Sequence, residues 1–198
     1  MKCIITILAA TSFLASSQLA AQDFDKGLKA YDAGDYHTAV REWGPLAEQG
    51  NVEAQYNLGF MYYNGQGLTQ NSAEAVKWYR LAAEQGHGDA RLNLGAMYRS
   101  GQGVPEDFVR AAKWYRLAAE QGNAIAQDNL GILYYFGDGV LQDNLIAYMW
   151  TNLAFENGAP EAQTRRDFIA EEMTKADISK AQDMAKYCIS SAYTKCGS

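Results

Sequence analysis

The residue types that most often bind metals or catalyse reactions are sparse in this chain. It has two histidines, His37 and His87, and neither has a second imidazole or a cysteine at the spacing of a metal site. The motifs H-E-x-x-H, G-x-S-x-G and S-x-x-K are absent. Both histidines lie in turn-like segments, which favours exposed turn residues. We therefore predict no catalytic residue, no metal and no cofactor, and we expect that the protein is not an enzyme.

Three Gly-x-Gly segments, at residues 65–67, 101–103 and 137–139, could suggest phosphate-binding loops. None follows a strand pattern, none completes G-x-G-x-x-G, and no P-loop lysine is present. The segments recur every 36 residues. This recurrence indicates turns between helices.

The same 36-residue period runs through most of the sequence without gaps. Aligned at this offset, small, apolar and aromatic residues fall into columns. Five of them are Ala54/Ala90/Ala126/Ala162, Leu58/Leu94/Leu130, Gly59/Gly95/Gly131, Tyr62/Tyr98/Tyr134 and Trp78/Trp114/Trp150. A fixed period of this length is typical of a stacked repeat array.

Each period predicts two helices. In the first repeat, apolar residues fall on one helical face of the segment EAQYNLGFMYYNG, which we call helix A. They do so again in the segment NSAEAVKWYRLAAEQG, which we call helix B. A hairpin of two such helices needs its neighbour to bury its apolar face, so the predicted fold is an all-α α-solenoid. Because glycine weakens a helix, the Gly59 column predicts close approach of helix B backbones. The tryptophan column is interpreted as packing, with an aromatic binding platform as the alternative.

The columns A-x-x-x-L-G-x-x-Y-x-x-G-x-G and A-x-x-W-Y-x-x-A-A-E-Q-G resemble the Sel-1-like repeats of the tetratricopeptide-like superfamily, and the chain resembles an exported bacterial member. The similarity places repeats at about 51–86, 87–122 and 123–158. Upstream, residues 23–50 resemble a shorter tetratricopeptide-type unit. Pro45 departs from the pattern and is expected to kink or delay the helix B of that unit. The repeat array is thus expected over residues 22–160.

The N-terminus predicts export. Residues 1–21 contain one lysine, a short apolar run and then small residues, the pattern of a signal peptide. A retained anchor is the alternative. We therefore expect a periplasmic or secreted protein without a membrane span after cleavage. The formal net charge of −6 disfavours nucleic acid as a partner, because phosphate would be repelled.

The C-terminal segment, residues 161–198, is predicted to form capping helices with a disulfide-bonded tail. Thr174 and Asp177 have the spacing of a capping box at the start of a helix. Cys188 and Cys196 would remain as an even pair in an oxidising compartment, which indicates a disulfide, with two unlinked thiols as the alternative. Similar C-terminal helices follow the repeats in many bacterial members of the family.

The tetratricopeptide likeness implies that helix A lines a concave face through four positions: three before, one after, four after and five after the helix A glycine. We call these the variable positions, because their residues differ between repeats. In the Sel-1-like repeats the candidate partner-binding residues are Tyr56, Phe60, Tyr63, Asn64, Leu92, Arg99, Asp128, Ile132, Tyr135 and Phe136, together with Ala96 and Ser100. The upstream unit adds Phe24, Leu28, Tyr31 and Asp32. Aromatic anchors with a few polar side chains are favoured at protein interfaces, whereas variation could also reflect freedom at solvated positions.

These features predict a scaffold or adaptor that binds a protein or peptide partner. An alternative is a binder or hydrolase of cell-envelope glycan or muropeptide, including β-lactamase-like activity, which cysteine-rich relatives of the repeat family suggest. The absence of S-x-x-K and of a disulfide in each repeat argues against this alternative. A structural subunit is a third hypothesis.

Overall fold

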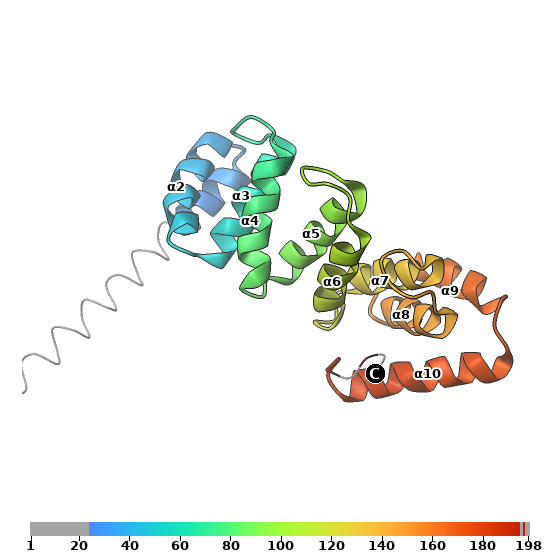
Figure 1. Ribbon diagram of the computed structural model, residues 1–198. Coiled ribbons are helices and arrows are strands. Elements are labelled where there is room, and N and C mark those ends of the chain that lie inside the picture. Colours follow the sequence, from blue (N-terminus) through green and yellow to red (C-terminus); the bar gives the residue numbers. More distant parts are fainter. Residues whose placement is uncertain (1–23, 195, 197–198) are drawn as a thin grey trace, which may run out of the picture. The chain divides into compact units, whose positions relative to one another are not determined.

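The computed structural model describes residues 24–194 and residue 196, and there every regular element is an α-helix (Figure 1). The chain divides into two compact units, Met1–Gln85 and Gly86–Ser198. The predicted signal peptide, residues 1–21, lies outside the described residues.

Unit 1 consists of two helical hairpins. Its helices are residues 24–32, α2 (Tyr36–Glu48), α3 (Val52–Asn64) and α4 (Ser72–Glu84). The first hairpin has a short turn, whereas residues 65–71 form a longer loop between α3 and α4. The core of this unit brings together the small and apolar faces of α2 and α3: Ala39, Trp43, Leu46, Ala47, Ala54, Leu58 and Met61.

Unit 2 contains two longer-loop hairpins followed by the C-terminal helices. Its helices are α5 (Gly88–Ser100), α6 (Phe108–Ala119), α7 (Ala124–Phe136), α8 (Asn144–Glu156), α9 (Ala162–Ala170) and α10 (Lys175–Ser190). Both α9 and α10 pack against α8. The contact with α9 has a counterpart in the packing of α6 against α7, whereas the contact with α10 is additional.

Local sequence sets the helix ends. Each helix B of the Sel-1-like repeats begins after an Asn or Asp whose side chain accepts backbone N–H groups; Asn71, for example, accepts from Ala73 and Glu74. Each helix A stops at a glycine with a positive φ, such as Gly65 at 70°. Such capping satisfies orphan backbone groups, and glycine adopts the left-handed conformation at little cost.

The Gly-x-Gly segments are turns, as their recurrence predicts. In the first Sel-1-like repeat, the loop returns across the start of α2. A Cβ atom added to Gly67, whose φ is 71°, would lie 2.6 Å from the backbone carbonyl of Tyr36. Gly139 lies in the same way against the backbone of Phe108 at the start of α6. In these two repeats the second glycine therefore permits the loop to pack on the preceding helix B.

The helix A glycines contact side chains in two repeats, which corrects the expectation of close helix B backbones there. A Cβ atom at Gly59 would lie 2.7 Å from the ring of Tyr79, and one at Gly95 would lie 2.7 Å from the ring of Tyr115. In the third repeat, Gly131 faces the Thr151 side chain, with the Ala147 carbonyl 3.0 Å from such an atom. Backbone approach therefore holds only where helix B has a small residue in place of the tyrosine.

The three tryptophans of the repeat column differ in how deeply they are buried. Trp150 on α8 is 0% exposed, whereas Trp78 and Trp114 are half-buried. Trp78 packs against the unit 1 core, as the packing interpretation requires. The difference at Trp150 coincides with α10, which packs against α8 in addition to the following helix A.

Pro45 does not interrupt its helix, contrary to the expectation of a delayed start. Helix α2 begins at Tyr36, where the Asp35 carboxylate accepts the Thr38 N–H, and it continues through Pro45 to Glu48. The preceding residue is Gly44, which has no Cβ to collide with the proline ring. Pro45 removes one amide donor and its ring crowds the carbonyl of the preceding turn, while Trp43, Leu46 and Ala47 beside it pack in the core and maintain the helix.

The C-terminal cap has the predicted local features. The Thr174 hydroxyl accepts the Asp177 N–H at 3.2 Å, and α10 starts at the next residue, Lys175. Cys188 and Cys196 form the predicted disulfide. Between them, the Tyr193 hydroxyl donates to Asn157 Oδ1 at 3.0 Å, so the closed tail reaches the end of α8.

Replacing both Cys188 and Cys196 with serine should lower the free energy of unfolding by about 2–3 kcal/mol, the loop-entropy contribution of a short closed loop. Guanidinium denaturation of the oxidised protein and the variant measures this difference. Reduction of the unmodified protein should reproduce it. Equal denaturation midpoints for all three samples would show that the disulfide does not stabilise the folded protein.

Candidate interaction surface

Each unit has a surface pocket between two consecutive helices A, and the variable positions line both pockets. The unit 1 pocket lies between helix 24–32 and α3 and has a volume of about 250 Å³. Its lining residues are Leu28, Tyr31, Asp32, Trp43, Tyr56, Asn57 and Phe60. Five of these seven were predicted from the sequence, and Trp43 and Asn57 were not.

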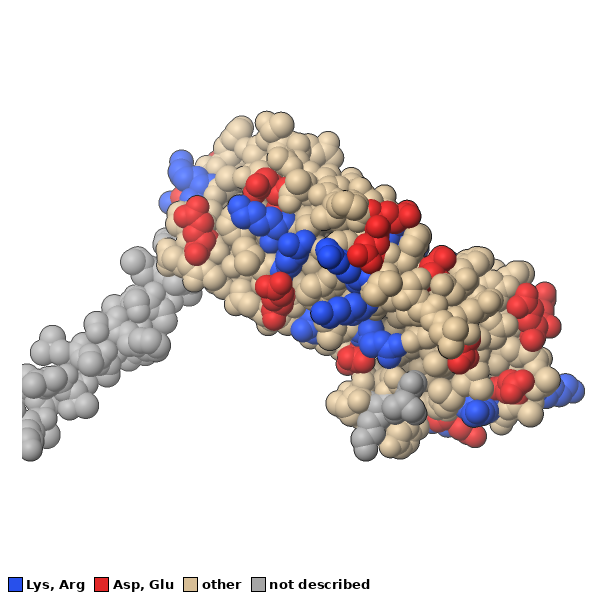
Figure 2. Space-filling view, viewed as in Figure 1, with Lys and Arg blue, Asp and Glu red and all other residues tan. Residues whose placement is uncertain are grey.

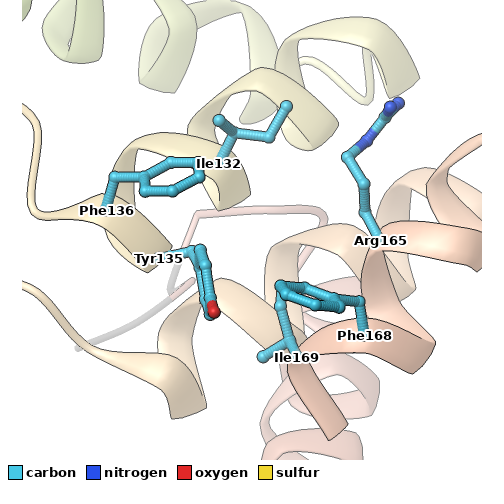
Figure 3. Close-up of a pocket in the computed structure, with 6 residues that line it drawn as sticks. All are labelled: Ile132, Tyr135, Phe136, Arg165, Phe168 and Ile169. Carbon is cyan, nitrogen blue, oxygen red and sulfur yellow. The ribbon is translucent and has the colours of Figure 1, made fainter. Parts of the chain in front are cut away.

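The unit 2 pocket lies between α7 and α9 and also has a volume of about 250 Å³ (Figure 3). Its lining residues are Ile132, Tyr135, Phe136, Arg165, Phe168 and Ile169. The Tyr135 ring meets Phe136 edge-on at 5.0 Å and Phe168 at 5.6 Å between centroids. Phe136 and Phe168 nevertheless remain 64% and 54% exposed. Large apolar side chains thus face solvent around one hollow.

Tyr135 is held in place by the segment that follows α9. Its hydroxyl donates to Glu172 Oε1 at 2.9 Å, and Asn144 Nδ2 donates to the other carboxylate oxygen at 3.2 Å. The hydrogen bond to Glu172, with smaller contributions from burial and from the carboxylate charge, raises the pKa of the Tyr135 phenol. The phenol therefore stays protonated and keeps Glu172 beside the pocket.

Asp128 was predicted as a polar selector, but the structure places its carboxylate in an internal ion pair. The Asp128 side chain is 8% exposed, and both of its oxygens accept from Arg165 of α9, with Nε 2.7 Å from Oδ1. This hydrogen bonding raises the pKa of the Arg165 guanidinium. The pair joins α9 to α7, and Arg165 also lines the pocket, so a partner would not meet a free Asp128 carboxylate.

The remaining candidates lie outside both pockets. Tyr63 is half-buried and Asn64 is exposed on α3, where Asn64 Nδ2 donates to the Phe60 carbonyl at 3.0 Å. On α5, Leu92 is half-buried and Arg99 is exposed. The structure therefore does not bring these four residues into the hollows that the other variable positions form.

Helix α9 supplies three lining residues of the unit 2 pocket that were not predicted, Arg165, Phe168 and Ile169, and the period contains a signal for Phe168. Ala162 continues the alanine column, so Asp167 stands where the next helix A glycine would be. The following variable positions are then Phe168, Glu171 and Glu172. Helix α9 thus stands at the helix A position that follows the third repeat, and α10, the next helix, packs against α8.

A buried amide network joins successive hairpins near the pocket. Gln127 of α7 is 0% exposed; its Nε2 donates to the Ala119 carbonyl at 3.1 Å, and its Oε1 accepts from Asn157 Nδ2 at 2.8 Å. Gln55 of unit 1 repeats this arrangement with Ala47 and Gln85.

We expect Gln127→Leu to lower the free energy of unfolding by about 1–3 kcal/mol, because Ala119 and Asn157 would lose buried partners. Thermal melting followed by circular dichroism measures the change. Asn129→Leu is the control on the same helix, since Asn129 Nδ2 bonds only locally to the Ile125 carbonyl. Equal melting of the two variants would contradict a structural role for the network.

Within residues 24–194 and 196, no group of three or more His, Cys, Asp or Glu side chains could hold a metal ion. In the same part of the chain, no helix combines the length and apolar character needed to cross a membrane.

Comparison with known proteins identifies the repeats. The sequence model of the Sel1 repeat matches residues 52–87, 88–123 and 124–158, more than half of the chain. A search of curated proteins found no match.

Two solved structures share the fold. A protective antigen of uropathogenic Escherichia coli with an SLR fold is 36% identical over 83% of this chain, with a TM-score of 0.74. A Sel1 repeat protein from Oxalobacter formigenes is 33% identical over 78% of this chain, with a TM-score of 0.71. This chain spans 36% of the first protein and 63% of the second.

These matches confirm the predicted fold class, an α-solenoid of helical repeats. Proteins with Sel1 repeats are generally scaffolds for protein interaction and are typically not catalysts. With three matched repeats and two structural relatives above 30% identity, the chain belongs to the Sel1 repeat family.

Proposed function

We propose that this protein is an exported scaffold that binds a protein or peptide partner through the variable positions of its helices A. The observation that carries the proposal is the pair of pockets, one in each unit, formed at equivalent positions of consecutive helices A. Exposed aromatic rings around a hollow are typical anchors of protein interfaces. A packed helical framework presents them already ordered, which reduces the entropy cost of binding.

The periplasmic or secreted location is part of the proposal. The N-terminal pattern and the Cys188–Cys196 bond support it, because disulfides persist in oxidising compartments. Cell fractionation with thiol alkylation tests it. Recovery of the chain in the envelope or medium with both cysteines protected is expected, and a cytoplasmic, fully alkylated chain would contradict it.

The glycan or hydrolase alternative has no support in the matched family. At the variable positions of the second and third Sel-1-like repeats the one carboxylate is Asp128, and it is ion-paired with Arg165. General acid–base hydrolysis needs carboxyl groups that can exchange protons beside the substrate.

Affinity capture tests the scaffold function. The full chain and a Phe136→Ser, Phe168→Ser variant would serve as baits in extract from the source cells, with quantitative mass spectrometry as the readout. The matched control is Ile125→Ser with Leu141→Ser, since both residues are exposed and neither lines a pocket. A partner retained by the control and lost by the pocket variant is expected. Identical sets for all three baits would reject the α7/α9 pocket as a binding site.

A further inference from the structure

The strongest feature beyond the proposed function is the charge around the α7/α9 pocket. Among its lining residues the cation is Arg165, and its guanidinium is already bonded to Asp128. Glu172 is exposed and accepts a hydrogen bond from the hydroxyl of Tyr135, which lines the pocket. Glu171 is the C-cap of α9, at the negative end of the helix dipole. Figure 2 shows acidic side chains where α9 ends, and both acidic and basic side chains where α10 begins.

The unit 1 pocket has a carboxylate at the equivalent repeat position. Asp32 lies five residues after Gly27, as Glu172 lies five after Asp167, the residue in the glycine column. Asp32 lines its pocket beside Leu28 and Tyr31. The helix that supplies the acid differs between the two pockets. Asp32 lies on the first of the two helices and lines its pocket, whereas Glu172 follows the second helix, α9, and is joined to its pocket by the hydrogen bond from Tyr135.

The size of the α7/α9 pocket limits its occupant. About 250 Å³ is below the range of roughly 300–1,000 Å³ that small-molecule sites occupy. Its openings are lined by aromatic and aliphatic groups. A single large apolar side chain of a partner fits this volume and chemistry better than a polar cofactor.

We infer that the α7/α9 pocket receives a large apolar side chain from a peptide segment that carries Lys or Arg directly beside it. The apolar side chain is buried between Phe136 and Phe168, and the neighbouring cation faces Glu172. This inference rests on the proposed function and specifies the partner's chemistry. Acid-flanked segments are rejected, because their carboxylates would meet Glu171 and Glu172.

Synthetic peptides that differ at three adjacent positions test this pairing. The probes are otherwise identical and contain Arg-Phe-Arg, Gln-Phe-Gln, Glu-Phe-Glu or Arg-Ser-Arg. Their affinity for the full chain is measured by fluorescence anisotropy at low and high salt.

The Arg-Phe-Arg peptide should bind about threefold more tightly than Gln-Phe-Gln, since each exposed charge pair contributes little to the binding free energy. High salt should narrow this difference. Arg-Ser-Arg should bind at least about tenfold more weakly, because it lacks the anchor.

Variants assign the effect to the pocket. Glu172→Gln keeps an acceptor for Tyr135 but removes the charge, so it should erase most of the preference for Arg over Gln. Asp183→Asn is the control, an exposed acid of α10. Phe136→Ser with Phe168→Ser should abolish the dependence on phenylalanine, and unchanged melting would show that the fold is intact.

Four outcomes would overturn the inference. No peptide binds; Arg-Phe-Arg binds no more tightly than Gln-Phe-Gln or Glu-Phe-Glu; or Arg-Ser-Arg binds as tightly as Arg-Phe-Arg. The fourth is that the pocket variants prefer the same peptides as the unmodified chain. Pocket-dependent binding without a charge order would leave the scaffold function standing and reject only the basic flank. Light scattering provides one more check. If the chain forms dimers that the two serine substitutions dissociate, a second copy occupies the pocket and the inference is wrong.

Discussion

Replacing Arg165 with methionine is expected to lower the free energy of unfolding by about 3–5 kcal/mol, the cost of leaving a buried charge without its partner. The Asp128 side chain is only 8% exposed. Its carboxylate has lost most of its water and receives two hydrogen bonds from the guanidinium instead. Methionine fills a similar volume, so the main loss is electrostatic. Helix α9 should loosen first, because this pair joins it to α7.

A double variant separates the loss of stability caused by the unpaired charge from the loss caused by altered packing. Asp128→Leu together with Arg165→Met removes both charges, and buried pairs replaced by apolar residues are often nearly neutral in stability. We therefore expect most of the loss to be recovered. Lys186→Met is the control for an exposed pair, with Lys186 and Asp183 76% and 71% exposed, and should cost less than about 1 kcal/mol. If chemical denaturation gives Arg165→Met the same free energy of unfolding as the wild type, then the Asp128 carboxylate is hydrated and the prediction is wrong.

The same substitution should also affect binding. Arg165 lines the α7/α9 pocket, and its ion pair positions Phe168 and Ile169 on α9. The Arg165→Met variant should therefore bind the Arg-Phe-Arg peptide more weakly than the double variant does. Equal affinities would show that the pocket does not depend on the docking of α9.

Gly59→Val should destabilise unit 1 by about 3 kcal/mol or more, at the upper end of the usual cost of overpacking a core. The Cβ alone would lie 2.7 Å from the Tyr79 ring, which is 1% exposed and cannot move into solvent. This loss exceeds the gain of less than about 1 kcal/mol from removing a helical glycine. Urea denaturation followed by circular dichroism measures the net effect.

A double-mutant cycle with Tyr79→Leu tests the cause. Leucine lacks the ring atoms that face Gly59, so valine should cost much less in that background. An interaction of at least about 1 kcal/mol between the two sites is expected for residues in contact. If the two losses simply add, then valine acts through helix propensity or the unfolded chain, and the close-contact explanation is wrong.

The repeat architecture could be predicted because its determinants are local and recur. The alternation of helices follows from apolar spacing, the capping residue Asn71 and the left-handed glycine Gly65, each of which acts within a few residues. Cys188 and Cys196 are eight residues apart, so the short segment around them sufficed to predict their bond. The variable positions could be counted from each helix A glycine for the same reason.

Environments that depend on distant neighbours were harder to predict. Trp78, Trp114 and Trp150 share a column, yet only Trp150 is fully buried, and α8 is the helix B that α10 packs against in addition to the following helix A. Gly131 faces Thr151 and backbone where Gly59 faces a tyrosine ring. A column states which residue types recur, whereas burial depends on what packs over them.

The sequence by itself determined the period, the helical hairpins, the caps, the disulfide and the positions that vary between repeats, since these depend on contacts within one repeat. Only the tertiary structure decided which variable positions form pockets. It placed Phe168 of α9 opposite Phe136 of α7 and took Asp128 out of the exposed surface by pairing it with Arg165. The reason is that a pocket and a buried charge both require two helices to meet, and the energy of that contact belongs to neither segment alone.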